Sequence, residues 1–259
     1  MQRWKDAIEL RHSSRTYSGE VLPGELNENL KQFINTVNKS IEGVRAVLVE
    51  DGGDKVVLSI MGSYGLIKGV RAYIAFIADM NGENLYEKIG YLGEMCVLEA
   101  TAMGLDTCWI SGTFKPQIVE DQLSIKPDEK VIAITPVGYS KKKSLAERIM
   151  KKVMVSHKRK PLEELCQGGY NPDWPKWIND SLNLARVAPS AVNKQPWCFV
   201  IGEGEKEIKV KIDDLKNAER KKLDCGIVML HLEIGALSNG IDGKWSYLEL
   251  PDIAVYNTN

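Results

Sequence analysis

The sequence predicts an α+β protein made of two similar halves, and three observations support this fold class. Apolar residues recur at helical spacing in residues 4–10, 25–38, 85–103, 177–185 and 225–239. Short apolar runs at residues 46–49, 56–60, 73–77, 131–135 and 198–201 predict buried strands. A helix, a strand and a long helix ending in Gly-(Leu/Ile)-Asp then occur twice in the same order. Glycine and proline punctuate these elements, and Gly104 suits the left-handed position that ends a helix.

The repeat is visible in two registers. A shift of 136 positions gives five identities in a gapless window of twenty residues, pairing Gly90, Ala100, Gly104, Asp106 and Trp109 with Gly226, Ala236, Gly240, Asp242 and Trp245. A shift of 144 places residues 33–35 (Phe-Ile-Asn) on residues 177–179 (Trp-Ile-Asn). Two matches in one chain order favour an ancient duplication, with halves at residues 1–150 and 151–259. The alternative is that buried helices ending in glycine look alike without common descent.

Composition excludes several classes of protein. The 259 residues are 44% hydrophobic and 27% charged, which is typical of a globular chain, and a net charge of -1 provides no field to recruit nucleic acid. No apolar run is long enough to span a bilayer and the N-terminus lacks the pattern of a signal peptide, so we expect a cytoplasmic protein without a membrane partner. Five scattered cysteines and three histidines show no metal-ligand spacing, so no metal is expected.

Residues 141–160 contain nine lysines or arginines and one glutamate. We interpret this basic stretch as a connecting segment between the halves. The alternative, a nucleic-acid-binding segment, is disfavoured because aromatic residues are not interleaved with the basic ones.

Two polar stretches could carry chemistry. Arg11, His12, Ser13 and Arg15 place two guanidinium groups and a hydroxyl where they can converge on one anion, although a solvated helix end is the alternative. Residues 188–197, APSAVNKQPW, form a polar loop directly before a predicted buried strand. Such loops are common places for ligand sites, and an ordinary connection does not explain so many specific residue types together.

These stretches resemble the signatures of the nitroreductase family. RHSSRTY resembles its N-terminal RxSxR motif, APSAVNKQPWCF is similar to its (A/P)SxxNxQPW motif, and GLDTCWISGTF followed by VIAITPVGY resembles two later signatures. The resemblance implies an α+β nitroreductase-like fold with antiparallel-rich sheets flanked by helices, and FMN as cofactor. In the family each FMN site lies at a homodimer interface, so the duplication implies a monomer that acts as a pseudo-dimer.

The distribution of the motifs departs from the family pattern. The first half has no NxQPW loop near residues 41–50, and the second half has no clean RxSxR. The resemblance therefore implies a single complete FMN site, with one motif supplied by each half.

The resemblance also assigns roles to individual residues, all of them in FMN binding. Arg11, with His12 and Ser13, would hold the phosphate end, and Arg15 would lie near the N1–C2 edge of the flavin. Ser111 and Gly112 would approach flavin N5. The second half would contribute Pro189, Ser190, Ala191 and Asn193, together with Arg159 as a basic residue near the phosphate. The spacing of Arg159 from the motif is loose, and it favours the interpretation of a solvated linker side chain over this role. Residues 63–65, Ser-Tyr-Gly, are a weaker candidate for the pyrimidine edge.

The function that follows is an FMN-dependent NAD(P)H oxidoreductase. The resemblance implies ping-pong hydride transfer from NADH or NADPH to a small-molecule acceptor such as a nitroaromatic or a quinone, with no dedicated catalytic acid or base. The alternative is a flavin-binding redox sensor or flavin store that turns over poorly. A basic-segment interaction protein is a third possibility.

Overall fold

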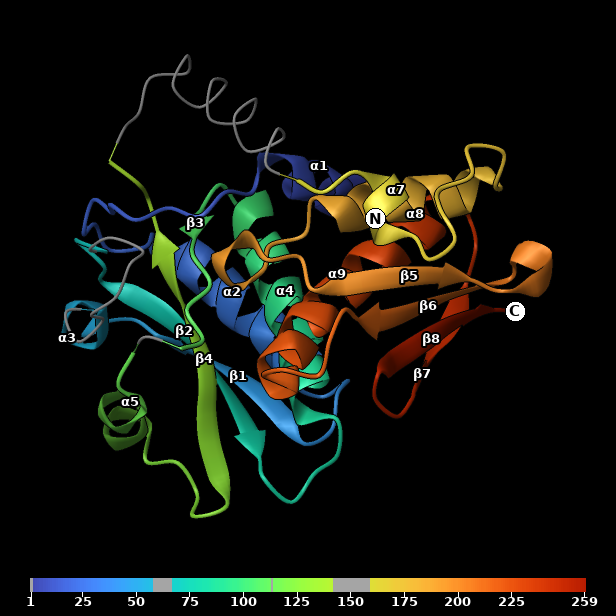
Figure 1. Cartoon of the computed structure of the whole chain (residues 1–259). Coiled ribbons are helices and arrows are strands. Elements are labelled where there is room, and N and C mark those ends of the chain that lie inside the picture. Colours follow the sequence, from blue (N-terminus) through green and yellow to red (C-terminus); the bar gives the residue numbers. More distant parts are fainter. Residues whose placement is uncertain (1, 58–66, 113, 142–158) are drawn as a thin grey trace. The chain divides into compact units, whose positions relative to one another are not determined.

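The computed structural model describes residues 2–57, 67–112, 114–141 and 159–259 (Figure 1). Within them the chain divides into two compact units, which we call the N-terminal unit (Leu10–Ser144) and the C-terminal unit (Met1–Glu9 with Leu145–Asn259). The boundary predicted between residues 150 and 151 lies outside the described residues. Helix α1 spans Gln2–Leu10, and all of it up to Glu9 belongs to the C-terminal unit.

The N-terminal unit is built on an antiparallel sheet of four strands in the order β1-β2-β4-β3. These strands are β1 (Val44–Val49), β2 (Ala72–Asp79), β3 (Asp106–Thr107) and β4 (Glu129–Gly138). Helices α2 (Gly24–Val37) and α4 (Leu85–Ala102) pack against strands of the sheet, and α5 (Pro116–Leu123) contacts β4 and the short helix α3 (Gly53–Val57). Strand β2 is buried along almost its whole length, which explains why its sequence is a continuous apolar run rather than an alternating one.

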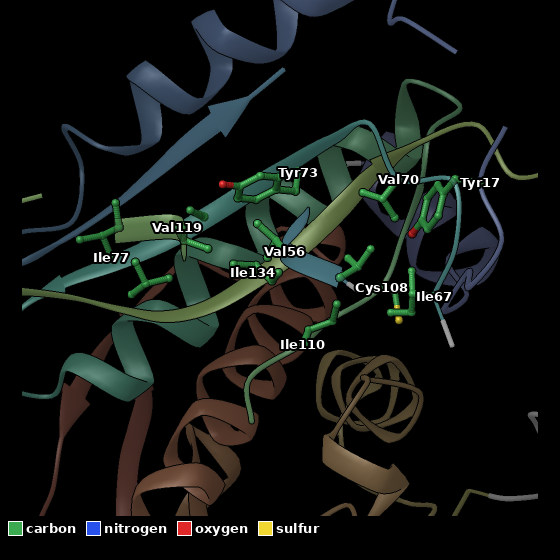
Figure 2. Packing of buried hydrophobic residues seen from close by; sticks show 13 residues of the cluster. Tyr17, Val56, Ile67, Val70, Tyr73, Ile77, Cys108, Ile110, Val119 and Ile134 are labelled. Atoms are coloured by element: carbon green, nitrogen blue, oxygen red, sulfur yellow. The ribbon is translucent and has the colours of Figure 1, made fainter. Parts of the chain in front are cut away.

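The core beside this sheet is apolar. Figure 2 shows the cluster that joins alternate residues of β2, such as Tyr73 and Ile77, to Val56 of α3 and Val119 of α5. Tyr17 and Cys108 belong to the same cluster, so the segment after α1 is anchored on the core of the N-terminal unit.

The C-terminal unit repeats the architecture. Its antiparallel sheet has the order β5-β6-β8-β7, with strands β5 (Trp197–Ile201), β6 (Glu207–Ile212), β7 (Gly243–Tyr247) and β8 (Asp252–Thr258). Helix α8 (Lys176–Arg186) packs along the long helix α9 (Ala218–Ser238), and α7 (Leu162–Leu165) contacts α8 and β5. Gly235 lets α8 and α9 approach closely, since a Cβ at this position would lie 2.7 Å from both the backbone nitrogen and the hydroxyl of Ser181.

The two units match in detail. In each, the last two strands are exchanged relative to chain order and a long helix precedes them. Each long helix starts after an asparagine in the left-handed region, Asn84 at φ 54 and Asn217 at φ 55. Each is followed by a left-handed glycine, Gly104 at φ +83 and Gly240 at φ +74. The predicted α+β fold with two antiparallel, helix-flanked halves is therefore confirmed.

One predicted strand is wrong. Residues 56–60 were expected to be extended, but Val56 and Val57 end helix α3, and residues 58–60 lie outside the described part. The two valines are fully buried in the apolar cluster. A short apolar pair is buried equally well in a helix or a strand, and here the turn at Gly52, whose carbonyl accepts from Lys55 at 3.1 Å, starts a helix instead.

Candidate functional site

The first candidate group lies in residues 11–15, which we call the arginine segment. Its backbone runs beside strand β3, where the amide of Ser14 donates to the carbonyl of Thr107 at 2.9 Å. Further along, the Lys68 amide donates to the Arg15 carbonyl at 3.0 Å, and the Tyr17 amide donates to the Lys68 carbonyl at 2.8 Å. The segment is therefore held along its length, and its side chains project from a fixed backbone.

Arg11, Ser13 and Arg15 all act electrostatically on the thiol of Cys108. Burial raises the pKa of this thiol, while Arg15, Arg11 and a hydrogen bond from Ser13 act in the opposite direction. That the two guanidinium groups and the hydroxyl converge on one anion stays a prediction. Burial lowers the pKa of Arg11, and the nearby Glu94 and Cys108 oppose that effect. The buried Nε of Arg11 has no hydrogen-bond partner among the described residues.

His12 points elsewhere. Its Nε2 lies 3.4 Å from Oδ1 of Asp106 and 3.1 Å from the hydroxyl of Ser14. Oδ2 of Asp106 in turn accepts a hydrogen bond from the Ser140 amide at 3.0 Å. These contacts give His12 a role in fixing the end of β3.

Ser111 and Gly112 directly follow Ile110, whose backbone is hydrogen-bonded to strand β4. Ile110 and Ile134 exchange reciprocal backbone hydrogen bonds of 2.9 Å just before them. Ser111 is half-buried and Gly112 is exposed, and the next residue lies outside the described part. The backbone of this pair is therefore positioned by β4 and accessible.

The second candidate group is the loop at residues 188–195, between α8 and β5. Val192, Asn193 and Gln195 adopt left-handed φ angles of 55°, 57° and 49°. A β-branched residue such as Val192 rarely adopts this conformation, which costs about 1–3 kcal/mol. Val192 is also 57% exposed, so no burial of its own side chain offsets the strain. The surrounding contacts must hold the loop in this form.

Internal hydrogen bonds supply part of that hold. The Gln195 amide donates to the Ser190 hydroxyl at 2.9 Å, and the Asn193 amide donates to the Ser190 carbonyl at 3.0 Å. The buried carboxamide of Gln195 accepts from the Lys160 amide at 2.8 Å and donates to the Asn193 carbonyl at 3.1 Å. Pro189 before them is buried. The motif residues therefore form one hydrogen-bonded structure.

Arg159 is bonded to this loop. Its guanidinium donates to Oδ1 of Asn193 at 2.7 Å and to the carbonyl of Val187 at 3.0 Å, so it clamps both ends of residues 187–193. The solvated-linker interpretation of Arg159 is therefore wrong. The fixed fork of arginine suits two acceptors at once. The other residues of the predicted connecting segment lie largely outside the described part, as do the candidates at 63–65.

Sequence reasoning missed Asp224, an acidic residue in the second turn of α9, at the start of its apolar stretch. Its carboxylate accepts from the Ala191 amide at 3.0 Å and 3.2 Å, one distance for each oxygen. The residue is only 5% exposed. Burial raises the pKa of Asp224 to about 7, although the Ala191 amide and Lys194 oppose this effect. A lone acidic residue on a buried helix face was the available signal.

The structure thus assembles two groups. Arg11, Ser13 and Arg15 act on one thiol in the N-terminal unit, while loop 188–195, Arg159 and Asp224 are joined by hydrogen bonds in the C-terminal unit. His231 is fully buried and bonded to the Leu184 carbonyl at 2.9 Å, as expected for a core histidine. Across the described residues, no cluster of His, Cys, Asp and Glu is arranged to hold a metal ion. None of the described helices combines the length and apolar character needed to cross a membrane.

Comparisons with known proteins identify the class. A solved structure described as a putative nitroreductase from Thermotoga maritima MSB8 has the same fold, with a TM-score of 0.66 and 20% sequence identity over 100% of this chain and 94% of that one. The sequence pattern of a family described as "Putative TM nitroreductase" matches residues 4–236. The chain therefore belongs to this nitroreductase family.

Other similar structures cover part of the chain. An FMN-dependent nitroreductase from Clostridium difficile R20291 is 20% identical over 53% of this chain and 88% of that one, with a TM-score of 0.45. A nitroreductase family protein from Clostridium difficile 630 is 18% identical over 64% of this chain and 97% of that one, with a TM-score of 0.47. No functionally curated protein matched the sequence.

Proposed function

We propose that this protein is an FMN-dependent NAD(P)H oxidoreductase of the nitroreductase type. The arginine segment of one half and loop 188–195 of the other jointly hold one FMN per chain, and the monomer acts as a pseudo-dimer. NADH or NADPH is the electron donor, and a small molecule such as a nitroaromatic or a quinone is the acceptor.

The observation that carries the proposal is the buried, unpartnered Nε of Arg11 in the arginine segment. Arg11 is a cation whose charge is disfavoured by burial, and its Nε has no hydrogen-bond partner among the described residues. An unpaired buried donor is costly, and a bound anion removes that cost. Ser13 and Arg15 act on the same Cys108 thiol as Arg11, and the chemistry of these donors fits a phosphate or another anionic edge of FMN.

Bound FMN supplies the hydride chemistry, so the protein's part is to bind, orient and exclude water. Arg11 and Ser13 would hold the phosphate end. Arg15, which is exposed, would place a positive charge beside the edge of the ring that becomes anionic on reduction. Gly112 has no side chain to obstruct close approach of the backbone of residues 111–112 to the ring.

The loop residues supply the other side of the site. The left-handed conformation of Val192 and Asn193 turns this stretch outward, and Arg159 fixes the orientation of the Asn193 carboxamide. Ser190 and Gln195 are engaged within the loop and therefore shape it. Pro189, Ala191 and Asn193 are the residues through which the loop would touch FMN.

The purified full chain tests this proposal through its visible flavin spectrum. We expect bound flavin that bleaches when NADH or NADPH is added without oxygen and recovers when a quinone is supplied. Yellow protein that neither nucleotide bleaches would support the alternative of a flavin-binding sensor or store. Colourless protein that takes up no added FMN would refute both functions.

A pair of variants examines the anion site itself. Arg11→Gln is expected to weaken FMN binding by about tenfold or more, because a hydrogen bond to a charged group contributes about 1.5–3 kcal/mol. Arg71→Gln is the matched control, since this arginine is 42% exposed and lies in the same unit outside the segment. Equal FMN affinity in the two variants would remove the arginine segment from the site.

A further inference from the structure

Asp224 has no assigned role, yet it is the buried acidic group that reaches the candidate loop. It lies in the second turn of α9, 5% exposed, and both of its carboxylate oxygens face the Ala191 amide at 3.0 Å and 3.2 Å. A buried carboxylate is expensive unless its hydrogen bonds repay the loss of water. The hydrogen bond to the Ala191 amide therefore accounts for the buried position of the Asp224 carboxylate.

What it holds is the first residue of the strained turn. Ala191 directly precedes Val192 and Asn193, both in the left-handed region. Ser190 and Gln195 close the turn from inside, and Arg159 bonds Asn193 and Val187 from the other side. Asp224 adds the contact that ties the turn to the long helix. Without it, the Ala191 amide loses its acceptor and the turn can relax toward ordinary φ angles.

We infer that Asp224 is a positioning residue that fixes loop 188–195 in its FMN-binding conformation by accepting the hydrogen bond of the Ala191 amide. This inference rests on the proposed function only for the identity of the ligand. The positioning of the loop itself is a property of the protein alone.

The charge of the carboxylate strengthens the bond. Among the described charged groups, Lys194 of loop 188–195 acts on the Asp224 carboxylate. Its positive charge favours the ionised form of Asp224. Burial raises the pKa of Asp224 to about 7, so the carboxylate gains its proton as the pH falls through neutrality. A hydrogen bond to a carboxylate is stronger than one to a neutral carboxyl group. The loop should be held more tightly at pH 8 than at pH 6.

Two substitutions separate positioning from general stability. Asp224→Ala removes the acceptor, whereas Asp224→Asn keeps an uncharged oxygen of the same shape. Glu219→Gln on the exposed first turn of α9 is the matched control. Hydrogen exchange of the peptide that contains residues 189–195 is measured in the full-length protein without FMN, and FMN affinity is measured separately.

We expect Asp224→Ala to speed exchange of this peptide and to weaken FMN binding by about tenfold, the effect of one lost hydrogen bond to a charged group. Asp224→Asn should keep most of the slow exchange of this peptide and most of the FMN affinity. Its exchange should change between pH 6 and pH 8 only by the intrinsic effect of pH, whereas Glu219→Gln should show the additional change expected of the wild type. Wild-type exchange in Asp224→Ala would overturn the inference. So would exchange that rises equally across the C-terminal unit in both Asp224 variants.

The two proposals fail separately. If wild-type protein binds no FMN but loop exchange responds as described, the proposed function is wrong and the positioning role of Asp224 stands. If FMN binds and reacts but loop exchange in Asp224→Ala is that of the wild type, the reverse holds.

Discussion

Replacing Arg159 by lysine should loosen the candidate loop while keeping its charge. Arg159 donates at 2.7 Å to Asn193 and at 3.0 Å to the Val187 carbonyl. A hydrogen bond from a charged group contributes about 1.5–3 kcal/mol when buried, but Asn193 is exposed and solvent competes, so about 1 kcal/mol for each bond is the better figure. A lysine ammonium can reach one acceptor but does not reproduce the fork.

The free energy lost with one or both hydrogen bonds is comparable with the backbone strain that these bonds oppose. The left-handed Val192 alone costs about 1–3 kcal/mol, so a loop without its clamp shifts toward relaxed conformations. If only the clamped form binds FMN, the loss of one bond (about 1 kcal/mol) raises the dissociation constant about 5-fold, and the loss of both (about 2 kcal/mol) raises it about 30-fold.

Titration of the flavin-free protein with FMN, followed by fluorescence quenching, measures this constant. Arg220→Lys is the matched control, because it makes the same chemical change at an exposed position of the same unit. A dissociation constant for Arg159→Lys within twofold of Arg220→Lys would refute the claim that the clamp prepares the loop.

Two further predictions concern stability. Gly235→Ala should destabilise the C-terminal unit by about 3 kcal/mol, because a Cβ at 2.7 Å from the Ser181 nitrogen forces α8 and α9 apart; urea unfolding measures the loss, and an unchanged midpoint would contradict it. Arg45 lowers the pKa of Glu129 from its ordinary value of 4.5 to about 2 through hydrogen bonds of 2.8 Å. This stabilisation is complete above pH 4.5 and is lost as the pH falls through 2. Glu129→Gln should therefore cost about 2 kcal/mol at neutral pH and much less near pH 2, and a cost independent of pH would refute the pairing.

Much of the fold could be predicted because it is written in long, regular patterns. The helices at 85–102 and 218–238 combine extended apolar faces with a terminal glycine, and the continuous apolar run of β2 marks a strand buried on both faces. The repeat of two glycine-ended helices predicted two similar halves, and the two sheets have matching strand orders.

The parts that escaped prediction are short or depend on tertiary contacts. Strand β3 has two residues and exists only because β4 pairs with it. Strand β6 is amphipathic, with every second residue buried, but its glutamate and lysines made it resemble a charged segment. The residues Val56 and Val57 suited a strand by propensity, yet the turn at Gly52 made them helical.

The same distinction applies to the site. Its motif residues could be named from the sequence because they occur as contiguous stretches. Asp224 could not, since it lies 33 positions from its partner Ala191 and belongs to no motif. Arg159 was a candidate with an ambiguous role until its two acceptors in the loop were known.

The proposal that the arginine segment and loop 188–195 hold the same FMN can be tested with purified protein. Flavin content per chain, measured for wild type, Arg15→Ala and Asn193→Ala after identical purification, tests it most directly. We expect a single flavin per wild-type chain and markedly lower retention in both variants, although the two residues belong to different units. Full retention in either variant, or wild-type protein that cannot be loaded with FMN, would contradict it.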